Sequence, residues 1–242
     1  MTGEPDRGPV VDWSSGAPRS WRYGDIYHSA SGAVAQARHV FLAGCDLPAA
    51  WADASTWNVL ETGFGLGLNF LALLEALRRD PRRPRHLRFV SVEAHPVDAG
   101  DMRRAGDLNG AAIAACAREL ADRWPASLPP EVRLAFDDGR VELRVLVGEA
   151  AARLPSLPGG GFRADSIFLD GFSPARNPQM WSRPTLAAVA ACARSGSRLA
   201  TWTVAGGVRH ALADLGFGLQ RRPGLPPKRH CLQGVYLRPA AT

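Results

Sequence analysis

The chain has 242 residues, of which 46% are hydrophobic, and this is enough to bury the core of one α/β domain. No apolar run approaches the length of a membrane span, and the polar residues 1–9 hold no signal-peptide core, so neither a membrane protein nor an exported one is expected. The formal charge is +6, and Lys228 is the only lysine among 29 basic residues. Arginine suits phosphate contact, but a modest positive charge also fits an arginine-biased composition, and both interpretations stay open.

In chain order, the first element is a segment rich in Gly, Pro and Ser over residues 1–22, which is expected to be irregular. Residues 23–242 are expected to form a single domain. Strands are predicted over 57–61, 86–93, 132–136, 141–147, 164–170, 198–204, 217–221 and 231–237, and helices over 33–41, 68–79, 96–104, 111–124, 184–193 and 207–215. Asp138-Gly139 is a strong hairpin signal. The apolar middle strands indicate a largely parallel sheet covered on both faces, with an antiparallel edge and a β-hairpin insertion.

The loop after the first of these strands carries Gly63, Gly65 and Gly67. Its spacing is GxGxG, whereas the dinucleotide fingerprint requires GxGxxG, and no Lys-Ser/Thr follows as a phosphate-binding loop requires. Glu61 precedes the glycines and Glu93 ends the next strand, which is the arrangement expected for S-adenosylmethionine in a class I methyltransferase fold. The alternative is a glycine turn that only packs the helix against the strand.

Acids also follow the later strands. Glu149 lies where that fold places an acceptor for the adenine amine, although it also fits a first-turn acid favoured by the helix dipole, and both interpretations stay open. Asp170 ends a buried strand, at the edge where open α/β sheets bind ligands. The loop after it carries Phe172, Arg176 and Trp181, which indicates a site. The alternatives are a turn cap for Asp170 and core packing for Trp181.

At these residues the chain resembles a known family, the MnmC methyltransferase domain and its stand-alone form MnmD. The resemblance runs from about residue 23 to 236. It is carried by residues 25–27, 37–42, 61–70, 168–181, 208–209 and 228–229, of which 170–181 are the specific part. It implies a class I, Rossmann-like methyltransferase fold with lid elements at 23–56. It also implies methylation of the aminomethyl group at C5 of the tRNA wobble uridine, giving 5-methylaminomethyl-2-thiouridine, in the cytoplasm.

The resemblance also implies roles for individual residues. Asp170 is the candidate catalytic residue, facing the methyl acceptor. The expected S-adenosylmethionine-binding residues are Glu61, Gly63, Phe64, Gly65, Gly67, Asn69, Glu93 and Glu149. The expected substrate-binding residues are Tyr27, Phe172, Arg176, Trp181, Trp202, Arg209, Lys228 and Arg229. The implied partner is tRNA, and the resemblance leaves open a functional link to a separate enzyme that supplies the aminomethyl precursor.

The reaction requires a neutral amine, yet an alkylammonium with a pKa near 10 is neutral in only about 10⁻³ of molecules at pH 7. Aromatic walls would disfavour the ammonium form, and Asp170 would hold and orient the amine rather than act chiefly as a base. The cysteines are widely spaced and no metal-ligand pattern occurs, so reduced thiols and no metal are expected.

Two clusters of cations are expected to differ in role. The arginines over 78–88 should lie away from the active face, and Arg221, Arg222, Lys228 and Arg229 should follow a late strand and contact phosphate. Two alternatives remain. One is a methyl- or aminopropyl-transferase acting on a small amine. The other is a non-catalytic tRNA-binding protein, motivated by Leu66 and Gly207, which depart from the family pattern.

Overall fold

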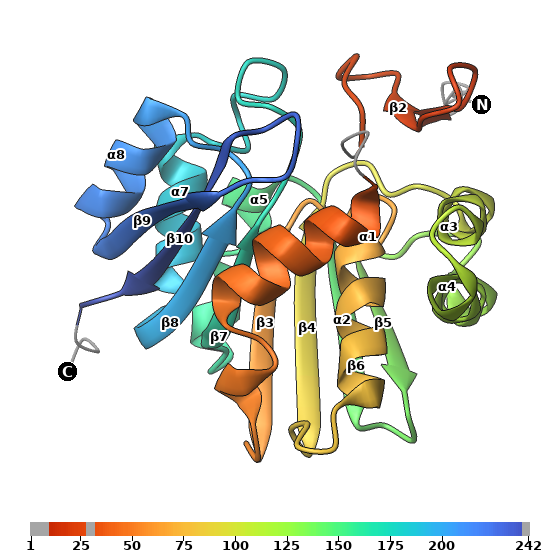
Figure 1. The fold of residues 1–242 in the computed structure, drawn as a ribbon, viewed down its shortest axis with the longest axis horizontal. Helices are drawn as coiled ribbons and strands as arrows, with labels where there is room; N and C mark the ends of the chain where they lie inside the picture. The colour runs from red at the N-terminus through yellow and green to blue at the C-terminus, as the bar shows by residue number, and fades with distance from the viewer. Residues whose placement is uncertain (1–9, 28–31, 239–242) are drawn as a thin grey trace, which may run out of the picture.

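The computed structural model describes residues 10–27 and 32–238 (Figure 1). Within these ranges the central sheet has eight strands in the order β5-β6-β4-β3-β7-β8-β10-β9. Their bounds are β3 Thr56–Thr62, β4 His86–Glu93, β5 Glu131–Phe136, β6 Val141–Val147, β7 Ala164–Leu169, β8 Ala193–Thr201, β9 Phe217–Pro223 and β10 His230–Tyr236. Strands β6, β4, β3, β7 and β8 are parallel, as predicted from their apolar runs.

Both ends of the sheet are antiparallel. Strand β5 pairs with β6 through the hairpin at Asp137-Asp138-Gly139, where all three residues have positive φ. The hairpin prediction is therefore confirmed. At the other end, β10 lies between β8 and β9, so the antiparallel strand stands one place in from the edge. Arg222 was expected in the loop after the predicted strand 217–221, but it lies with Arg221 within β9, because the ladder of β9 with β10 continues to Pro223.

Helices cover both faces of the sheet. One face is covered by α1 Ala33–Gln36 with its continuations η1 Ala37–Leu42 and η2 Ala43–Cys45, and by α2 Leu68–Arg79, α3 Ala99–Asp107 and α4 Ala111–Arg123. The other is covered by α5 Ala150–Arg153, α6 Ser156–Gly159, α7 Arg183–Ala191 and α8 Gly206–Asp214. Consecutive strand residues divide between the two cores: Val59 packs against the first group and Leu60 against the second.

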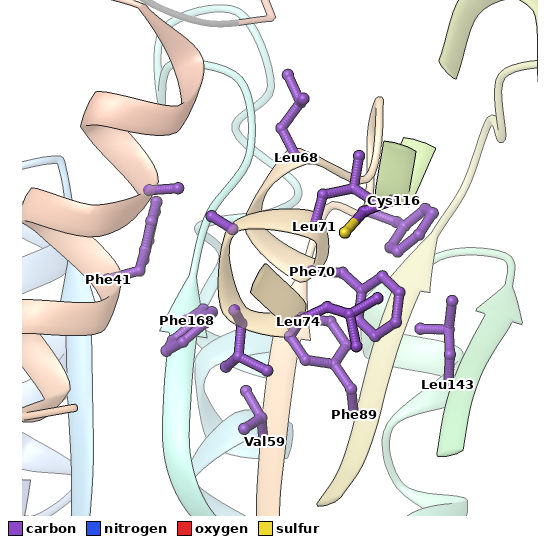
Figure 2. Close-up of a cluster of buried hydrophobic side chains, with 14 of the residues drawn as sticks. Phe41, Val59, Leu68, Phe70, Leu71, Leu74, Phe89, Cys116, Leu143 and Phe168 are labelled. Atoms are coloured by element: carbon purple, nitrogen blue, oxygen red, sulfur yellow. The ribbon is translucent and has the colours of Figure 1, made fainter. Parts of the chain in front are cut away.

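The first core is built around α2. Figure 2 shows Phe70 and Leu74 of α2 beside Phe89 of the sheet, in the cluster that also contains Val59 and Phe168. The rings of Phe70 and Phe89 meet edge to face with centroids 5.2 Å apart. This packing fixes the start of α2, and with it the glycine loop, against the ends of β3 and β4.

The N-terminal part differs from expectation. Residues 1–22 were expected to be irregular, and of these residues 1–9 lie outside the described ranges. The rest holds a short antiparallel pair, β1 Val11–Asp12 and β2 Arg19–Ser20. The predicted helix at 33–41 extends to Cys45 through η1 and η2, and η3 Ala49–Trp51 follows. In the described ranges no helix is both long and apolar enough to cross a membrane.

The carboxyl ends of the parallel strands meet at one edge of the sheet. The glycine loop follows β3, Glu93 ends β4, Glu149 comes just after β6 and Asp170 follows β7. The arginine cluster over 78–88 lies at the opposite edge, as the topology predicted. There Arg78 pairs with Asp137 at 2.6 Å.

Candidate active site

A pocket opens at this carboxyl edge, with about 790 Å³ of empty space that is partly open to solvent. Nine of its lining positions were predicted from the sequence as site residues: Tyr27, Gly63, Phe64, Gly65, Asn69, Glu93, Glu149, Asp170 and Phe172. The others are Tyr23, Ala33, Gln36, Leu66, Leu68, Ala94, Gly171, Asn177 and Met180. The structure therefore brings Glu93, Glu149 and Asp170 into one cavity with Tyr27 and Phe172.

The floor of the pocket is the glycine loop. Gly63, Gly65 and Gly67 have φ of 73°, 52° and 75°, which side chains rarely adopt. A Cβ on Gly63 would lie 3.2 Å from the backbone of Gly171, and one on Gly65 would lie 3.3 Å from the ring of Tyr27. Gly67 packs away from the cavity, against Leu120 and the ring of Phe64. The glycines thus allow the loop, the Asp170 strand end and Tyr27 to approach closely.

Replacing Gly65 by alanine is expected to lower Tm by about 2–8 °C, because left-handed backbone costs a side chain roughly 1–2 kcal/mol. The matched control is Gly207→Ala in α8, where a Cβ meets nothing within 4 Å. That control should hold or slightly raise Tm, since alanine favours a helix. Thermal unfolding of both variants measures the difference. Equal Tm values for the two variants would contradict the strained-loop assignment.

Glu93 is a half-buried carboxylate fixed at the pocket wall. Its Oε2 accepts from Gly65 N at 2.9 Å and its Oε1 accepts from His95 N at 2.8 Å. Burial raises the pKa of this carboxyl, while the backbone donors oppose the shift. Each oxygen keeps a lone pair for a ligand hydroxyl. Glu149 also lines the pocket, and although it stands at the N-cap of α5, its side chain makes no capping hydrogen bond.

A single amide joins two further acids. Asn69 Nδ2 donates to Glu61 Oε1 at 3.0 Å and to Asp170 Oδ2 at 2.8 Å. Glu61 is fully buried and also accepts from Ser91 Oγ at 2.6 Å, and burial raises its pKa. Asn69 and Asp170 line the pocket, whereas Glu61 lies behind Asn69. Glu61 therefore does not line the pocket itself but fixes the orientation of Asn69, which does.

Asp170 is held on all sides at the end of β7. Its backbone exchanges two hydrogen bonds with Thr62 Oγ1, and its Oδ1 accepts from Gly171 N at 2.8 Å. Burial raises the pKa of the carboxyl to about 6, although Gly171, Asn69 and Lys228 favour the charged form. The carboxylate is consequently ionised above about pH 6. The local Asp170–Gly171 bond fits the turn-cap interpretation, but the same side chain also lines the pocket.

Aromatic side chains form the outer wall. The ring of Phe172 lies 4.8 Å from Tyr23 and 5.0 Å from Tyr27. Asp25 Oδ2 accepts from Ser173 N at 3.1 Å, which ties the N-terminal segment to the loop after β7. Tyr23 was not assigned a site role from the sequence, since nothing in a lone aromatic near the N-terminus indicates which distant loop it meets.

Trp181 and Trp202 stand behind this wall. Trp181 is buried in the second core, and its Nε1 donates to Phe172 O at 2.8 Å. Core packing is thus what the structure shows for Trp181, and it supports Phe172 rather than lining the pocket. Trp202 donates from Nε1 to Gly171 O at 3.2 Å and meets Trp181 edge to face.

Lys228 differs from the other expected phosphate contacts. Its Nζ lies 3.2 Å from the centre of the Trp202 ring, and its charge interacts with Asp170 and Asp25. Burial lowers its pKa, which the two carboxylates oppose. Arg176 and Arg229 are exposed, and Arg209 is half-buried near the start of α8. The structure therefore separates one cation beside Asp170 from arginines around the rim.

The sequence profile of one family, described as an S-adenosyl-L-methionine-dependent methyltransferase, matches residues 111–237, just over half of the chain. The chain belongs to this methyltransferase family. The class I methyltransferase fold, the enzyme class and the resemblance drawn from the sequence are confirmed.

Relatives of this methyltransferase include "tRNA 5-methylaminomethyl-2-thiouridine biosynthesis bifunctional protein MnmC" of Delftia acidovorans, which is 52% identical over 227 residues. The match covers 93% of this chain and 35% of that protein. The protein of the same name from Thiobacillus denitrificans is 46% identical, with 93% and 36% covered. The chain thus spans about a third of the length of these relatives.

A solved structure described as MNMC2 from Aquifex aeolicus superposes on this methyltransferase with a TM-score of 0.75. The superposition covers 99% of this chain and 74% of that one, at 22% sequence identity. At that identity the likeness establishes a shared fold. Among the described residues, no group of His, Cys, Asp and Glu is arranged to hold a metal.

Proposed function

We propose that this methyltransferase binds S-adenosylmethionine in the pocket and methylates the aminomethyl group at C5 of the tRNA wobble uridine. The observation that carries the proposal is the position of Asp170, a carboxylate on the wall of the same pocket as Glu93 and the glycine loop. The substrate class is supported by relatives at about half identity that carry the MnmC name.

The residues present fit the cofactor. Glu93 presents a carboxylate at the pocket wall for the ribose hydroxyls, and Glu149, whose carboxylate makes no helix-capping hydrogen bond, can accept from the adenine amine. Glu61 and Asn69 lie near the start of α2, where the methionine amino group is expected in this fold. Bound there, S-adenosylmethionine supplies an electrophilic methyl group on a sulfonium.

Asp170 then binds and orients the amine of the substrate. The free Oδ lone pairs of Asp170 accept hydrogen bonds from the amine and turn its own lone pair toward the methyl group. The amine held by Asp170 would form the new N–C bond with the methyl group that the cofactor supplies, and the electrons of the broken S–C bond would leave with sulfur. The secondary ammonium that results loses its proton to water. Positioning by Asp170 is therefore its main role, and its charge alone would favour the unreactive ammonium.

Lys228 offsets that charge. Its ammonium sits on Trp202 and faces Asp170, so an incoming amine meets a cation as well as a carboxylate. A like charge disfavours the ammonium form and lowers the amine pKa. The aromatic residues around Phe172 act in the same direction by excluding water.

Replacing Lys228 by methionine is expected to raise the amine pKa seen in the pH dependence of kcat by about one unit. The rate should fall about tenfold at pH 7 and approach the wild-type rate only above about pH 10, where the amine is mostly neutral without help. Arg229→Met is the control and should lower kcat/KM without moving this pKa. Equal loss of rate at every pH in Lys228→Met would contradict the charge-offset role.

Phosphate contact is assigned to the rim arginines at the carboxyl edge. Arg229→Ala should weaken tRNA binding more than Arg83→Ala, and should reduce the slope of log affinity against log salt by about one. Both side chains are exposed, but Arg83 lies at the opposite edge of the sheet. Binding titrations at several salt concentrations measure both effects. A larger loss for Arg83→Ala would contradict the assigned face.

The direct test uses purified protein, methyl-labelled S-adenosylmethionine and tRNA carrying 5-aminomethyluridine. Label in the wobble nucleoside supports the proposal. Transfer to small alkylamines but not to tRNA would instead indicate a small-amine transferase. Cofactor binding by calorimetry is measured alongside, since absence of binding would contradict every enzymatic interpretation.

A further inference from the structure

An exposed tryptophan stands on the N-terminal segment beside the pocket. Trp21 is 64% exposed, and Ile26 on the same turn is 39% exposed. The side chains of Arg19 and Arg22 beside it are also exposed. A large exposed aromatic ring with two arginines close by in the sequence is well suited to a flat, anionic partner.

The turn that carries Trp21 is closely hydrogen-bonded. Gly24 N donates to Ser20 O at 2.9 Å, and Ser20 N donates to Asp25 O at 2.8 Å. Arg19 Nη2 closes the turn on Gly24 O at 2.7 Å. Trp21 is consequently presented from a defined backbone, so the entropy lost when a partner binds is small.

The same turn contacts the loop after β7, which carries Phe172 and Ser173. Asp25 accepts from Ser173 N, and Tyr23 stacks against Phe172 while lining the pocket. Trp21 lies two residues from Tyr23. Figure 1 shows the β2 segment beyond the carboxyl edge of the sheet, on the same side as the loop after β7. Trp21 therefore belongs to the same hydrogen-bonded turn as Tyr23, which lines the pocket.

We propose that Trp21 stacks on an unpaired RNA base next to the nucleotide whose amine enters the pocket, and that Arg22 contacts the adjoining phosphate. The inference rests on the proposed function and adds a recognition element to it. A uridine that enters the pocket must leave its neighbours, and this exposes the face of an adjacent base. Aromatic side chains that stack on such bases are the common means of binding single-stranded RNA.

The experiment measures fluorescence anisotropy of a labelled anticodon stem-loop RNA at several salt concentrations. Trp21→Ala and Trp21→Leu should both weaken binding by about tenfold with an unchanged salt slope, because stacking releases no counterions. Trp21→Phe should keep most of the affinity. Arg22→Ala should instead reduce the salt slope by about one. The matched control is Leu108→Ala, because Leu108 is 63% exposed at the end of α3.

Other results would overturn either the stacking proposal or the proposed function. Wild-type affinity in Trp21→Ala, or full affinity in Trp21→Leu, would overturn the stacking proposal while leaving the proposed function intact. An equal loss in Trp21→Ala for a blunt duplex RNA would also overturn it, since a duplex offers no free base along its length. No RNA binding by the wild-type protein would instead contradict the proposed function. Calorimetry with S-adenosylmethionine confirms that each variant is folded.

Discussion

Replacing Asp170 by asparagine is expected to lower kcat/KM for tRNA methylation by about 10²–10³-fold while S-adenosylmethionine affinity stays within about threefold. Asparagine can still accept from Gly171 N, so the loop after β7 is retained. Its amide, however, presents a donor to Asn69 Nδ2 and removes the negative charge that holds the amine. Single-turnover transfer and calorimetry on the same preparation separate the two effects.

The pH dependence of the wild-type protein is a second test of whether activity requires the ionised form of Asp170. The pKa of this carboxyl is raised to about 6 by burial, so the carboxylate form is lost as pH falls through 6. We therefore expect kcat/KM to fall below about pH 6 in addition to its general rise with neutral amine. The step near pH 6 should vanish in Asp170→Asn. If Asp170→Asn lowers the affinity for S-adenosylmethionine as much as it lowers kcat/KM, Asp170 binds the cofactor or supports the fold instead.

Replacing Glu93 by glutamine is expected to weaken S-adenosylmethionine binding by about 10–150-fold, since a hydrogen bond to a charged group contributes roughly 1.5–3 kcal/mol. Glutamine keeps the shape but offers one oxygen where Gly65 N, His95 N and the ribose need two. With saturating cofactor, kcat should return to near the wild-type value. Calorimetric titration measures the affinity and a cofactor series measures kcat.

The control for Glu93→Gln is Glu142→Gln, because Glu142 lies on β6 and only makes long contacts with Arg88 and Arg133. Its cofactor affinity should equal that of the wild-type protein. An unchanged affinity in Glu93→Gln would show that the ribose is held elsewhere in the pocket.

Those parts of the site that depend on strand ends were predictable from the sequence. A buried strand that ends in an acid puts that acid at the carboxyl edge, and this placed Glu93 and Asp170 correctly. The hairpin at Asp138-Gly139 was equally readable, because its turn chemistry is local. The glycine loop followed from the same logic.

Contacts between side chains that are far apart in the sequence could not be predicted. Asn69 bridges Glu61 and Asp170 only because of the way α2 is oriented about its axis against the sheet, which the sequence does not show. Trp181 lies in a motif that indicated a pocket wall, yet its indole nitrogen bonds the Phe172 carbonyl and the ring is buried.

The environment of Lys228 could not be predicted from the sequence either. In the sequence it stands beside Arg229 and resembles a member of a phosphate-binding pair. In the structure its ammonium lies on Trp202 and faces Asp170. Charge density along a sequence cannot separate two such neighbours, because the local fold of the loop between β9 and β10 directs them differently.

We propose that this methyltransferase converts an aminomethyl wobble uridine to its methylaminomethyl form. Mass spectrometry of tRNA nucleosides from cells with and without the protein tests it most directly. Loss of the protein should remove 5-methylaminomethyl-uridine species and accumulate the 5-aminomethyl precursor, and Asp170→Asn should not restore the product. Unchanged wobble nucleosides in cells that contain no other enzyme for this step would contradict the claim.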